Sequence, residues 1–472
     1  MAGITSFSAY VPYNRLERKR IAAAHGKRGS SGERAVANYD EDSLTMAVAA
    51  ARSCLETVGA ECLDSVHFAS TTAPNKDKQS AAHITSIIDR EGAMRTADFG
   101  GTLRAGASAM LAALDLAEKG KNTLVAIADC RMGAPDGPFE ASFGDGAAAF
   151  CFGNENVIAE CLGTYSAAHD FYDTWRDEND KFVRFFEDRF ALNEGFVPFV
   201  LESIQGILEQ TGLKPADFAR VVIDASNDKK TGMILKQAGF RPEQGCEGLI
   251  SCFGYSGAAY APTLLVGALE QSSVGDLILY VSYGEGSDAM VFKVIGEPKP
   301  GGNKGVAYFK ENKKNTLTYD KYIRWKQLME YEPQRRPPFT RSSLPDFYRK
   351  RKKNLACYGT VCTECGTPHF PPSRICIHCA SIDKMEPYSF LSKKAKLATF
   401  SVDYLAYSLD SPNIVVVVDF EGGGRMFTNI VDCDIDKVAI DMPVTLVYRK
   451  MYSAGGIHTY FWKCVPASEA VK

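Results

Sequence analysis

The sequence predicts an α/β body built from two similar halves, followed by a metal-binding module and a small antiparallel β-barrel. Up to residue 297, β-rich runs alternate with small-residue helical stretches, as in SLTMAVAAARSCLETVG followed by DSVHFAST. This alternation is typical of sheets covered by helices. Two CxxC pairs follow, and from about Lys394 short strand-like runs are separated by Gly, Asp and Pro turns. Such runs are typical of a small antiparallel barrel.

The two halves of the body, about 1–160 and 161–297, are predicted from an internal repeat. Three pairs of segments match at a nearly constant spacing: HFAST with VIDAS at Ala69 and Ala225, RAGASAMLAAL with YSGAAYAPTLLVGAL at Gly106 and Gly257, and LVAIAD with LILYVS at Leu124 and Leu277. A constant spacing over three elements indicates a duplicated arrangement of strand, helix and strand.

Composition shifts place the remaining boundaries. The Pro- and Gly-rich stretch VIGEPKPGGNKG closes the body near residue 297, because such residues interrupt helices and strands. We expect a basic, helix-prone connector over 298–345, the cysteine module over 346–392 and the barrel over 393–472.

The overall composition indicates a soluble globular protein of more than one domain. The chain has 472 residues, 45% of them apolar and 24% charged, with a formal net charge of -3. This charge gives no global attraction to nucleic acid or to an anionic membrane. No run approaches the roughly 18 apolar residues of a membrane span, and the N-terminus lacks the pattern of a signal peptide. We expect a cytoplasmic protein whose isolated cysteines are reduced.

Four of the 14 cysteines form a predicted zinc site: Cys362, Cys365, Cys376 and Cys379. Each CxxC knuckle brings two thiolates to one cation, and four thiolates complete a tetrahedral shell without an open position. The metal would therefore be structural. The alternative is a set of core cysteines without metal. His369 and His378 lie close by in the sequence, but they are not needed as ligands.

The body resembles a known enzyme family. The stretches DEDSLTMAVAAA, FEASFGDGAAAF, FGYSGAAYAPTLLVGAL and SYGEGSDAMVF are similar to the 3-hydroxy-3-methylglutaryl-CoA synthase branch of the thiolase superfamily, close to ketoacyl carrier-protein synthase III. The resemblance implies a thiolase fold of layered sheets and helices, and a coenzyme A thioester as substrate or ligand.

The C-terminal part, about 335–466, resembles a second family through CTECGTPHFPPSRICIHC and the runs behind it. This is the family known as domain of unknown function 35, which joins a rubredoxin-like zinc ribbon to an OB-fold barrel. Such domains typically accompany thiolase-type enzymes, where they help to dock subunits and to host acyl-CoA. The resemblance therefore implies a separate thiolase subunit as partner, with self-association through the thiolase fold.

The position of the family's nucleophile carries no thiol. In the synthase family a cysteine at the start of the helix after a strand attacks the acyl thioester, because a helix N-terminus lowers the thiol pKa. In ADFGGTLRAGASAM this position falls at Leu103, or within one residue of it at Thr102 or Arg104. A leucine cannot form a thioester.

The other family roles are also replaced. The early glutamate, a general acid/base, falls at Thr71, and the histidine of the HxPN turn falls at Asp224, although Asn227 keeps the asparagine of that turn. The asparagine before the YSG turn falls at Phe253. An ionised aspartate cannot donate to a thioester carbonyl as the histidine does.

Replacement chemistry within the chain has a few candidates. Cys130 and Cys252 lie at predicted strand ends or turns that face the pocket of this fold, but cysteines in apolar surroundings are more often inert. Asp224 could accept a proton, with an ordinary hydrogen-bonded turn aspartate as the alternative. We expect His169 to be a polar residue of the surface or core. The Gly-rich turns SFGDGAAA, CFGYSGA and SYGEGSDA fit close approach to a pantetheine arm or tight turns between packed layers.

Basic side chains near the connector are candidates for binding the phosphates of CoA: Arg335, Arg336 and Lys353, the last in the run Arg349–Lys353. The same run could meet an acidic partner surface or form a solvated helix end. A zinc ribbon beside basic residues also raises nucleic-acid binding as a remote alternative, but the barrel strands lack the aromatic and basic pattern of a stacking surface.

The leading hypothesis is an acyl-CoA-handling subunit of a thiolase-type acyltransferase complex that forms or cleaves C–C bonds, with the nucleophile on a partner chain. The alternative is a self-sufficient condensing or cleaving enzyme, similar to hydroxymethylglutaryl-CoA synthase, whose site is rebuilt around Asp224, Asn227 and Cys252. The sequence leaves open whether this chain catalyses a reaction alone.

Overall fold

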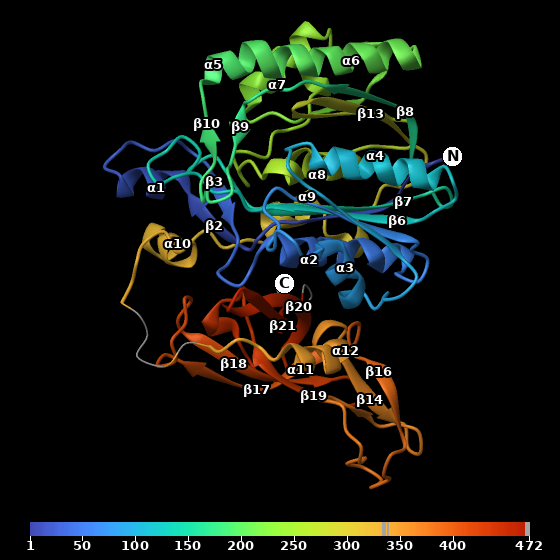
Figure 1. Ribbon diagram of the computed structural model, residues 1–472, viewed down its shortest axis with the longest axis vertical. Coiled ribbons are helices and arrows are strands. Elements are labelled where there is room, and N and C mark those ends of the chain that lie inside the picture. The colour runs from blue at the N-terminus through green and yellow to red at the C-terminus, as the bar shows by residue number, and fades with distance from the viewer. Residues whose placement is uncertain (333–336, 338, 468–472) are drawn as a thin grey trace. The chain divides into compact units, whose positions relative to one another are not determined.

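The computed structural model describes residues 1–332, 337 and 339–467, and the chain forms two compact units (Figure 1). The first unit comprises residues 1–37, 42–85 and 90–319. The second comprises residues 38–41, 86–89 and those from 320 onward. The first unit thus extends beyond residue 297, where the sequence analysis placed the end of the body. Among the described residues, no helix combines the length and the apolar character that a membrane crossing needs.

A nine-stranded sheet forms the first unit. Its strands, in spatial order, are β11 (Arg220–Ile223), β12 (Leu277–Gly284), β13 (Gly286–Val294), β8 (Ala159–Ala168), β1 (Gly3–Tyr10), β7 (Gly146–Gly153), β6 (Thr123–Asp129), β4 (Ser65–Ala69) and β5 (Arg95–Phe99). The β1–β8 pairing involves only Gly3 and Ile4 of β1, so the sheet consists of two halves joined at this point.

The two halves repeat the same pairing pattern. In the first, β4 is parallel to β6, and β6, β7 and β1 are antiparallel in series. In the second, β11 is parallel to β12, and β12, β13 and β8 are antiparallel in series. The predicted repeat of two similar halves is therefore confirmed.

The remaining elements of the first unit are short strands and helices. The strands form the antiparallel pairs β2 (Asn14–Glu17) with β3 (Glu33–Val36), and β9 (Thr174–Trp175) with β10 (Arg184–Phe185). The helices are α1 (Arg18–Ala24), α2 (Ser43–Val58), α3 (Ser80–Ile87), α4 (Ala105–Ala117), α5 (Asp188–Phe190), α6 (Val197–Thr211), α7 (Asp228–Gln237), α8 (Tyr260–Glu270) and α9 (Val306–Glu311).

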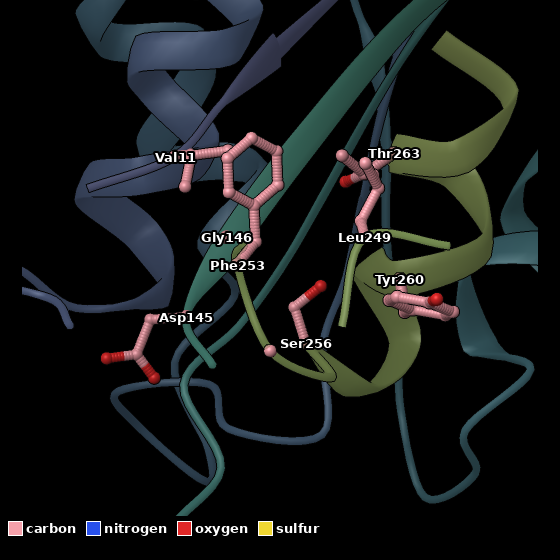
Figure 2. A pocket seen from close by; sticks show the side chains of 9 residues that line it. Val11, Asp145, Gly146, Leu249, Phe253, Ser256, Tyr260 and Thr263 are labelled. Carbon is pink, nitrogen blue, oxygen red and sulfur yellow. The ribbon is translucent and has the colours of Figure 1, made fainter. Parts of the chain in front are cut away.

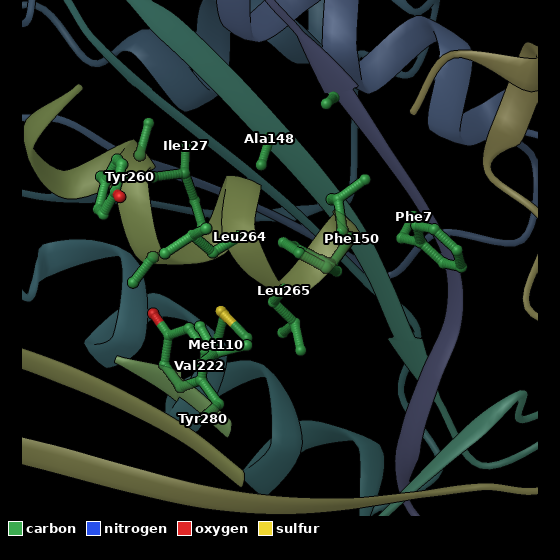
Figure 3. Close-up of a cluster of buried hydrophobic side chains, with 14 of the residues drawn as sticks. Phe7, Met110, Ile127, Ala148, Phe150, Val222, Tyr260, Leu264, Leu265 and Tyr280 are labelled. Atoms are coloured by element: carbon green, nitrogen blue, oxygen red, sulfur yellow. The ribbon is translucent and has the colours of Figure 1, made fainter. Parts of the chain in front are cut away.

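The helices and sheet halves form alternating layers, with α4 and α8 between the two halves, α2 outside the first half and α6 outside the second (Figure 1). The central layer is tight because its helices carry small residues. A side chain at Gly106 of α4 would lie 2.8 Å from the carbonyl oxygen of Ala258, just before α8. Larger buried side chains from α4, α8 and both sheet halves, including Met110, Leu264 and Tyr280, fill the remaining space (Figure 3).

The second unit contains a short helical segment and two sheets. The helices are α10 (Tyr319–Trp325), which starts at the last residue of the first unit, α11 (Leu344–Arg349) and α12 (Arg351–Leu355). A three-stranded sheet has the order β15 (Pro368–His369), β14 (Tyr358–Cys362), β16 (Met385–Ser389). A five-stranded antiparallel sheet has the order β19 (Arg425–Asn429), β18 (Asn413–Phe420), β17 (Ala395–Asp403), β20 (Pro443–Ala454), β21 (Ile457–Pro466).

The five-stranded sheet is consistent with the predicted OB-fold barrel. Its core includes Trp462, which is fully buried and donates a hydrogen bond of 3.1 Å from Nε1 to the carbonyl oxygen of Leu355. This bond satisfies the polar atom of a large buried ring and fixes α12 against β21.

Candidate active site and metal centre

Leu103 lies half-buried in the turn between β5 and α4, where the family's nucleophile is expected. The next residue, Arg104, precedes the first helical residue of α4. Its Nη1 lies 3.1 Å from Asp288 Oδ1 and donates a hydrogen bond of 3.0 Å to the carbonyl oxygen of Ala167. The start of this helix therefore carries an apolar side chain and an ion-paired arginine instead of a thiol.

Asp129 is the last residue of β6, and it binds the turn that contains Thr71, where the resemblance places the family's glutamate. Its carboxylate is fully buried and accepts hydrogen bonds from the hydroxyls of Ser70, Thr71 and Thr72 and from the amides of Thr71 and Ala258, at 2.8–3.0 Å. Five donors compensate for the desolvation of this carboxylate. Ala258 lies two residues before the start of α8, so Asp129 links the segment that leads into α8 to the Thr71 turn.

Asp224, directly after β11, is a buried carboxyl group with an unusual pKa. The Tyr255 hydroxyl donates a hydrogen bond of 3.0 Å to Asp224 Oδ1, and both side chains are buried. Burial raises the pKa of Asp224 to about 7, while Tyr255, the backbone at Tyr283 and the charge of Arg131 oppose this rise. Burial also raises the pKa of Tyr255, so the phenol remains a hydrogen-bond donor at neutral pH.

Arg131 connects the Asp129 and Asp224 groups electrostatically. It is 4% exposed, and its guanidinium lies 5.5 Å from the centre of the Phe143 ring. Burial lowers its pKa, while the charges of Asp129 and the nearby Asp173 oppose this change. Arg131 therefore lies near both Asp224 and Asp129, the carboxylate to which Thr71 donates.

Two Gly-rich turns hold this site by direct backbone packing. A side chain at Gly144 would lie 1.8 Å from the carbonyl oxygen of Phe253, and one at Gly254 would lie 2.7 Å from the backbone of Phe143. Gly254 also has a φ of 84°, which favours glycine. The hydrogen bonds of Tyr255 with Ser142 and Gly144 then fix its backbone at the site. These contacts fit the expectation of tight turns between packed layers.

A small cavity lies beside these turns (Figure 2). Its volume is about 10 Å³, and its lining includes Phe253, Ser256 and Tyr260. Such a volume holds at most one water molecule. Phe253, at the position of the family's asparagine, lines this cavity and contributes no polar group to it.

The two candidate cysteines lie in different environments. Cys130 belongs to the site, because its Sγ lies 3.7 Å from Thr72 Oγ1 and its amide donates to the same oxygen. Cys252 instead contacts the carbonyl oxygen of Leu249 at 3.3 Å, and burial raises its pKa. A raised pKa disfavours the thiolate that a nucleophile needs.

Asn227 and His169 have local structural contacts. Asn227 is exposed and caps α7, because its side chain accepts a hydrogen bond of 3.0 Å from the amide of Lys230. His169 pairs with Glu202 at 2.7 Å and stacks on Phe199, with 38% of its side chain exposed. These contacts fit the expectation that His169 is a polar surface residue.

The four predicted metal ligands converge in the second unit. The sulfur atoms of Cys362, Cys365, Cys376 and Cys379 lie within 4.8 Å of one another. The Cys362–Cys379 and Cys365–Cys376 sulfur distances are 3.7 and 3.5 Å. Zn–S bonds of about 2.3 Å in a tetrahedron require sulfur atoms about 3.8 Å apart, so the four side chains fit a zinc ion. His369 and His378 lie outside this four-sulfur cluster.

Of the predicted CoA-binding residues, only Lys353 is among the described residues. It lies half-buried in α12, and burial lowers its pKa. Arg335 and Arg336 lie outside the described residues.

Comparisons with known proteins agree with this architecture. The family model described as ChsH2, rubredoxin-like zinc ribbon domain, matches residues 358–386, and that described as ChsH2, C-terminal OB-fold domain, matches residues 388–449. The hydroxymethylglutaryl-CoA synthase of Methanocaldococcus jannaschii is 32% identical over 349 residues, which are 70% of this chain and 100% of that protein. That of Methanothermobacter thermautotrophicus is 32% identical over 310 residues, 62% of this chain and 89% of that protein.

Solved structures support the same fold. MvaS in complex with 3-hydroxy-3-methylglutaryl coenzyme A has a TM-score of 0.61 and 18% identity, over 72% of this chain and 94% of that chain. A hydroxymethylglutaryl-CoA synthase complexed with CoA has a TM-score of 0.60 and 17% identity, over 68% of this chain and 89% of that chain.

The layered halves and the four-cysteine centre define a thiolase-fold protein fused to a zinc ribbon and an OB-fold domain, which confirms the predicted fold class. Within this class, the chain belongs to the hydroxymethylglutaryl-CoA synthase family. The predicted resemblance is therefore confirmed for both parts of the chain.

Proposed function

We propose that this chain binds acyl-CoA and forms or breaks a C–C bond beside the thioester, in a site rebuilt around Asp224. The main support for this proposal is the buried Asp224–Tyr255 pair, in which burial raises the pKa of Asp224 to about 7. A group with this pKa can both accept and donate a proton near neutral pH, which is the requirement for general acid–base catalysis.

The burial of several ionisable side chains supports catalysis over a purely structural role. Asp129, Arg131 and Asp224 are each at least nine-tenths buried, and Asp224 falls where the resemblance places the family's histidine. Burying charged groups costs more free energy than burying apolar groups of similar size. The pKa of Arg131 is lowered and that of Asp224 is raised by burial, and neighbouring groups with shifted pKa values are typical of functional sites.

The reaction would proceed without an acyl-enzyme at the family position, because Leu103 offers no nucleophile. The ionised Asp224 would take a proton from the carbon beside the thioester, and the hydrogen bond from Tyr255 to Asp224 Oδ1 would hold the carboxyl group in position for this transfer. The thioester would remain intact on this chain. In the forming direction, the carbanion left by this transfer would add to the ketone carbon of a 3-ketoacyl-CoA, and the alkoxide so formed would take the proton back from Asp224. In the cleaving direction, the same steps would run in reverse from a 3-hydroxyacyl-CoA.

The C-terminal part of the chain would contribute a metal-stabilised ribbon and basic side chains that bind CoA. Zinc held by the four cysteines would fold the ribbon, and it would supply no chemistry because four thiolates leave no open position. Arg335, Arg336 and Lys353 remain our candidates for binding the CoA phosphates.

Turnover by the purified chain tests this proposal. The chain is incubated alone with a panel of 3-keto- and 3-hydroxyacyl-CoA thioesters, and with acetyl-CoA together with each, and products are identified by mass spectrometry. We expect turnover by the wild type and a loss of about 100-fold or more in Asp224→Asn, since general acid–base groups contribute about 10²- to 10⁴-fold. Equal turnover by the variant would contradict the role of Asp224.

A second candidate function is favoured by Leu103 at the nucleophile position: an acyl-CoA-handling subunit that needs a separate thiolase. Thiolase-fold surfaces would then serve self-association and assembly with that partner, through interfaces of about 2,000 Å² or more. Purification from the native cell tests it. A thiolase that co-purifies, with turnover only in the complex, would favour the subunit; full turnover by the isolated chain would exclude it.

A further inference from the structure

A buried network of charged side chains lies in the second unit. Its members are two cations and three carboxylates: Arg449 of β20, Lys463 of β21, Asp40, Glu41 and Asp432. No more than 6% of any of these side chains is exposed. Burying a charged group costs free energy unless the group is paired, so the pairing within the network determines how stable it is.

Arg449 links two carboxylates that lie far apart in the sequence. Its guanidinium forms ion pairs with Glu41 and with Asp432. Asp40 is paired separately, because Lys463 Nζ lies 2.8 Å from Asp40 Oδ2. The two cations thus fasten carboxylates of the segment that precedes α2 to the five-stranded sheet.

The carboxylates of this network outnumber its cations. Three negative and two positive charges would leave a net charge of -1 at a buried position. Burial raises the pKa of Asp432 to about 7; the charges of Glu41 and Asp40 add to this rise, while Arg449 and a hydrogen bond of 3.4 Å from Asn38 oppose it. A single proton, held mainly by Asp432, removes the excess charge.

Tyr39 and Lys463 also face the network, and both keep their charge states near neutral pH. Burial raises the pKa of Tyr39, so its phenol stays neutral. Burial lowers the pKa of Lys463, but the charges of Asp40 and Tyr39 outweigh this effect and the pKa is raised, so the ammonium group stays charged. A change of pH around 7 therefore acts on the network through Asp432.

The segment of residues 38–41 connects β3 to α2 and belongs to the second unit. Besides the ion pairs, the backbone carbonyl oxygen of Asp40 accepts a hydrogen bond of 2.9 Å from the amide of Lys450 in β20. The next residue, Asp42, caps α2 through its side chain. Because the chain passes directly from this segment into the cap, release of the segment would reach the start of α2 through the backbone.

We propose that this network is a proton-operated latch, which holds residues 38–41 on the five-stranded sheet while Asp432 is protonated and loosens when Asp432 is ionised. The ionised form leaves an uncompensated buried charge, which is relieved when the segment moves away with its two carboxylates. The folded-state pKa of about 7 lies above the ordinary value of 3.8. The stabilisation is therefore fully present below pH 4 and is lost as the pH rises through 7. The latch is independent of the proposed function, because it involves none of the residues around Asp224.

Hydrogen exchange of the full chain, measured by mass spectrometry at pH 5, 6, 7 and 8 and corrected for the intrinsic exchange rates, tests the latch. In the wild type, we expect the protection of peptides that cover residues 38–46 and Lys450 to fall about 10- to 100-fold from pH 5 to pH 8. Asp432→Asn and Glu41→Gln each leave two carboxylates for two cations. In both variants the protection of these peptides should change by less than about 3-fold over the same range.

Asp441→Asn provides a matched control, because the side chain of Asp441 is 69% exposed in the same unit and pairs with Lys396 at 2.5 Å. It should keep the pH dependence of the wild type. Thermal melting verifies that each variant is folded, and two variants of the network are used so that a folding defect in one leaves the other decisive. Protection that does not depend on pH in the wild type, or the wild-type dependence in a folded Asp432→Asn or Glu41→Gln, would overturn the latch. An equal loss in all peptides of the five-stranded sheet would also overturn it, because the proton would then stabilise the whole sheet.

Discussion

The Tyr255 hydroxyl and the Asp224 carboxyl group form a buried hydrogen bond of 3.0 Å at the position where the resemblance to the synthase family places a histidine. The pair joins two distant segments, because Asp224 follows β11 and Tyr255 lies in the turn before α8. At this position a carboxyl group with a pKa of about 7 takes the place of the imidazole that the resemblance implies.

Replacing Asp224 with Asn should change how stability depends on pH. The folded-state pKa of Asp224 is raised from 3.8 to about 7, so the folded state binds this proton more tightly than the unfolded state. The associated stability is fully present below pH 4 and is lost as the pH rises to 7. Relative to the wild type, Asp224→Asn should therefore gain stability between pH 4 and 8, by at most about 4 kcal/mol.

Chemical unfolding at pH 4, 6 and 8, with the first unit monitored separately, measures this difference. Asp217→Asn serves as a control, because Asp217 is an exposed carboxylate that accepts a backbone hydrogen bond from Lys214. A difference between Asp224→Asn and wild type that stays constant over this range would show that the carboxyl group titrates normally.

Asp129→Asn should destabilise the first unit strongly. The substitution turns one oxygen of a fully buried carboxylate into an amino group, which cannot accept the hydrogen bonds from Thr71 or Ala258. We expect a loss of about 2–4 kcal/mol, measured by urea unfolding. A loss below about 0.5 kcal/mol, the usual range of surface substitutions, would mean that Asp129 does not hold the Thr71 turn and α8 together.

The chain should form no stable acyl adduct when incubated with acetyl-CoA or acetoacetyl-CoA. Leu103 provides no thiol, and burial raises the pKa of Cys252. Intact-mass spectrometry measures this directly. An adduct on Cys130, which lies beside Thr72, would identify a relocated nucleophile, and Cys130→Ser should then abolish turnover.

The second unit should bind one zinc ion per chain. Replacing Cys376 with Ser should reduce the bound metal, measured by elemental analysis, and should lower the melting temperature of the second unit, because metal binding supplies folding free energy. Cys62→Ser is the control, since Cys62 is an exposed cysteine outside the cluster. Full zinc content in Cys376→Ser would exclude this residue as a ligand.

Much of the fold could be predicted from the sequence, because it depends on local patterns. The repeated strand segments that contain or precede Ala69 and Ala225 form β4 and β11, which pair in parallel with the equivalent strands β6 and β12. The spacing of the CxxC pairs likewise predicted the four-sulfur cluster, since each knuckle is a local turn.

The candidate site could be predicted only in part, because its contacts are long-range. Asp224 was a candidate from its position, but its partner Tyr255 is distant in sequence and was not predicted. Asp129 and Arg131 flank Cys130 in the stretch IADCRMG, in which the sequence pattern indicates only the cysteine as a candidate. Two charged residues directly at the end of an apolar strand could have indicated this site, because side chains at such a position are usually buried. Asn227 was favoured by the family motif, but it caps a helix.

Exchange of substrate protons with solvent tests most directly whether Asp224 transfers a proton without an acyl-enzyme. The purified chain is incubated with an acyl-CoA panel in deuterated water, and deuterium at the carbon beside the thioester is followed by NMR. We predict exchange that rises with pH around an apparent pKa near 7 and falls about 100-fold or more in Asp224→Asn. Exchange that is absent from the wild type, or equally fast in the variant, would contradict it.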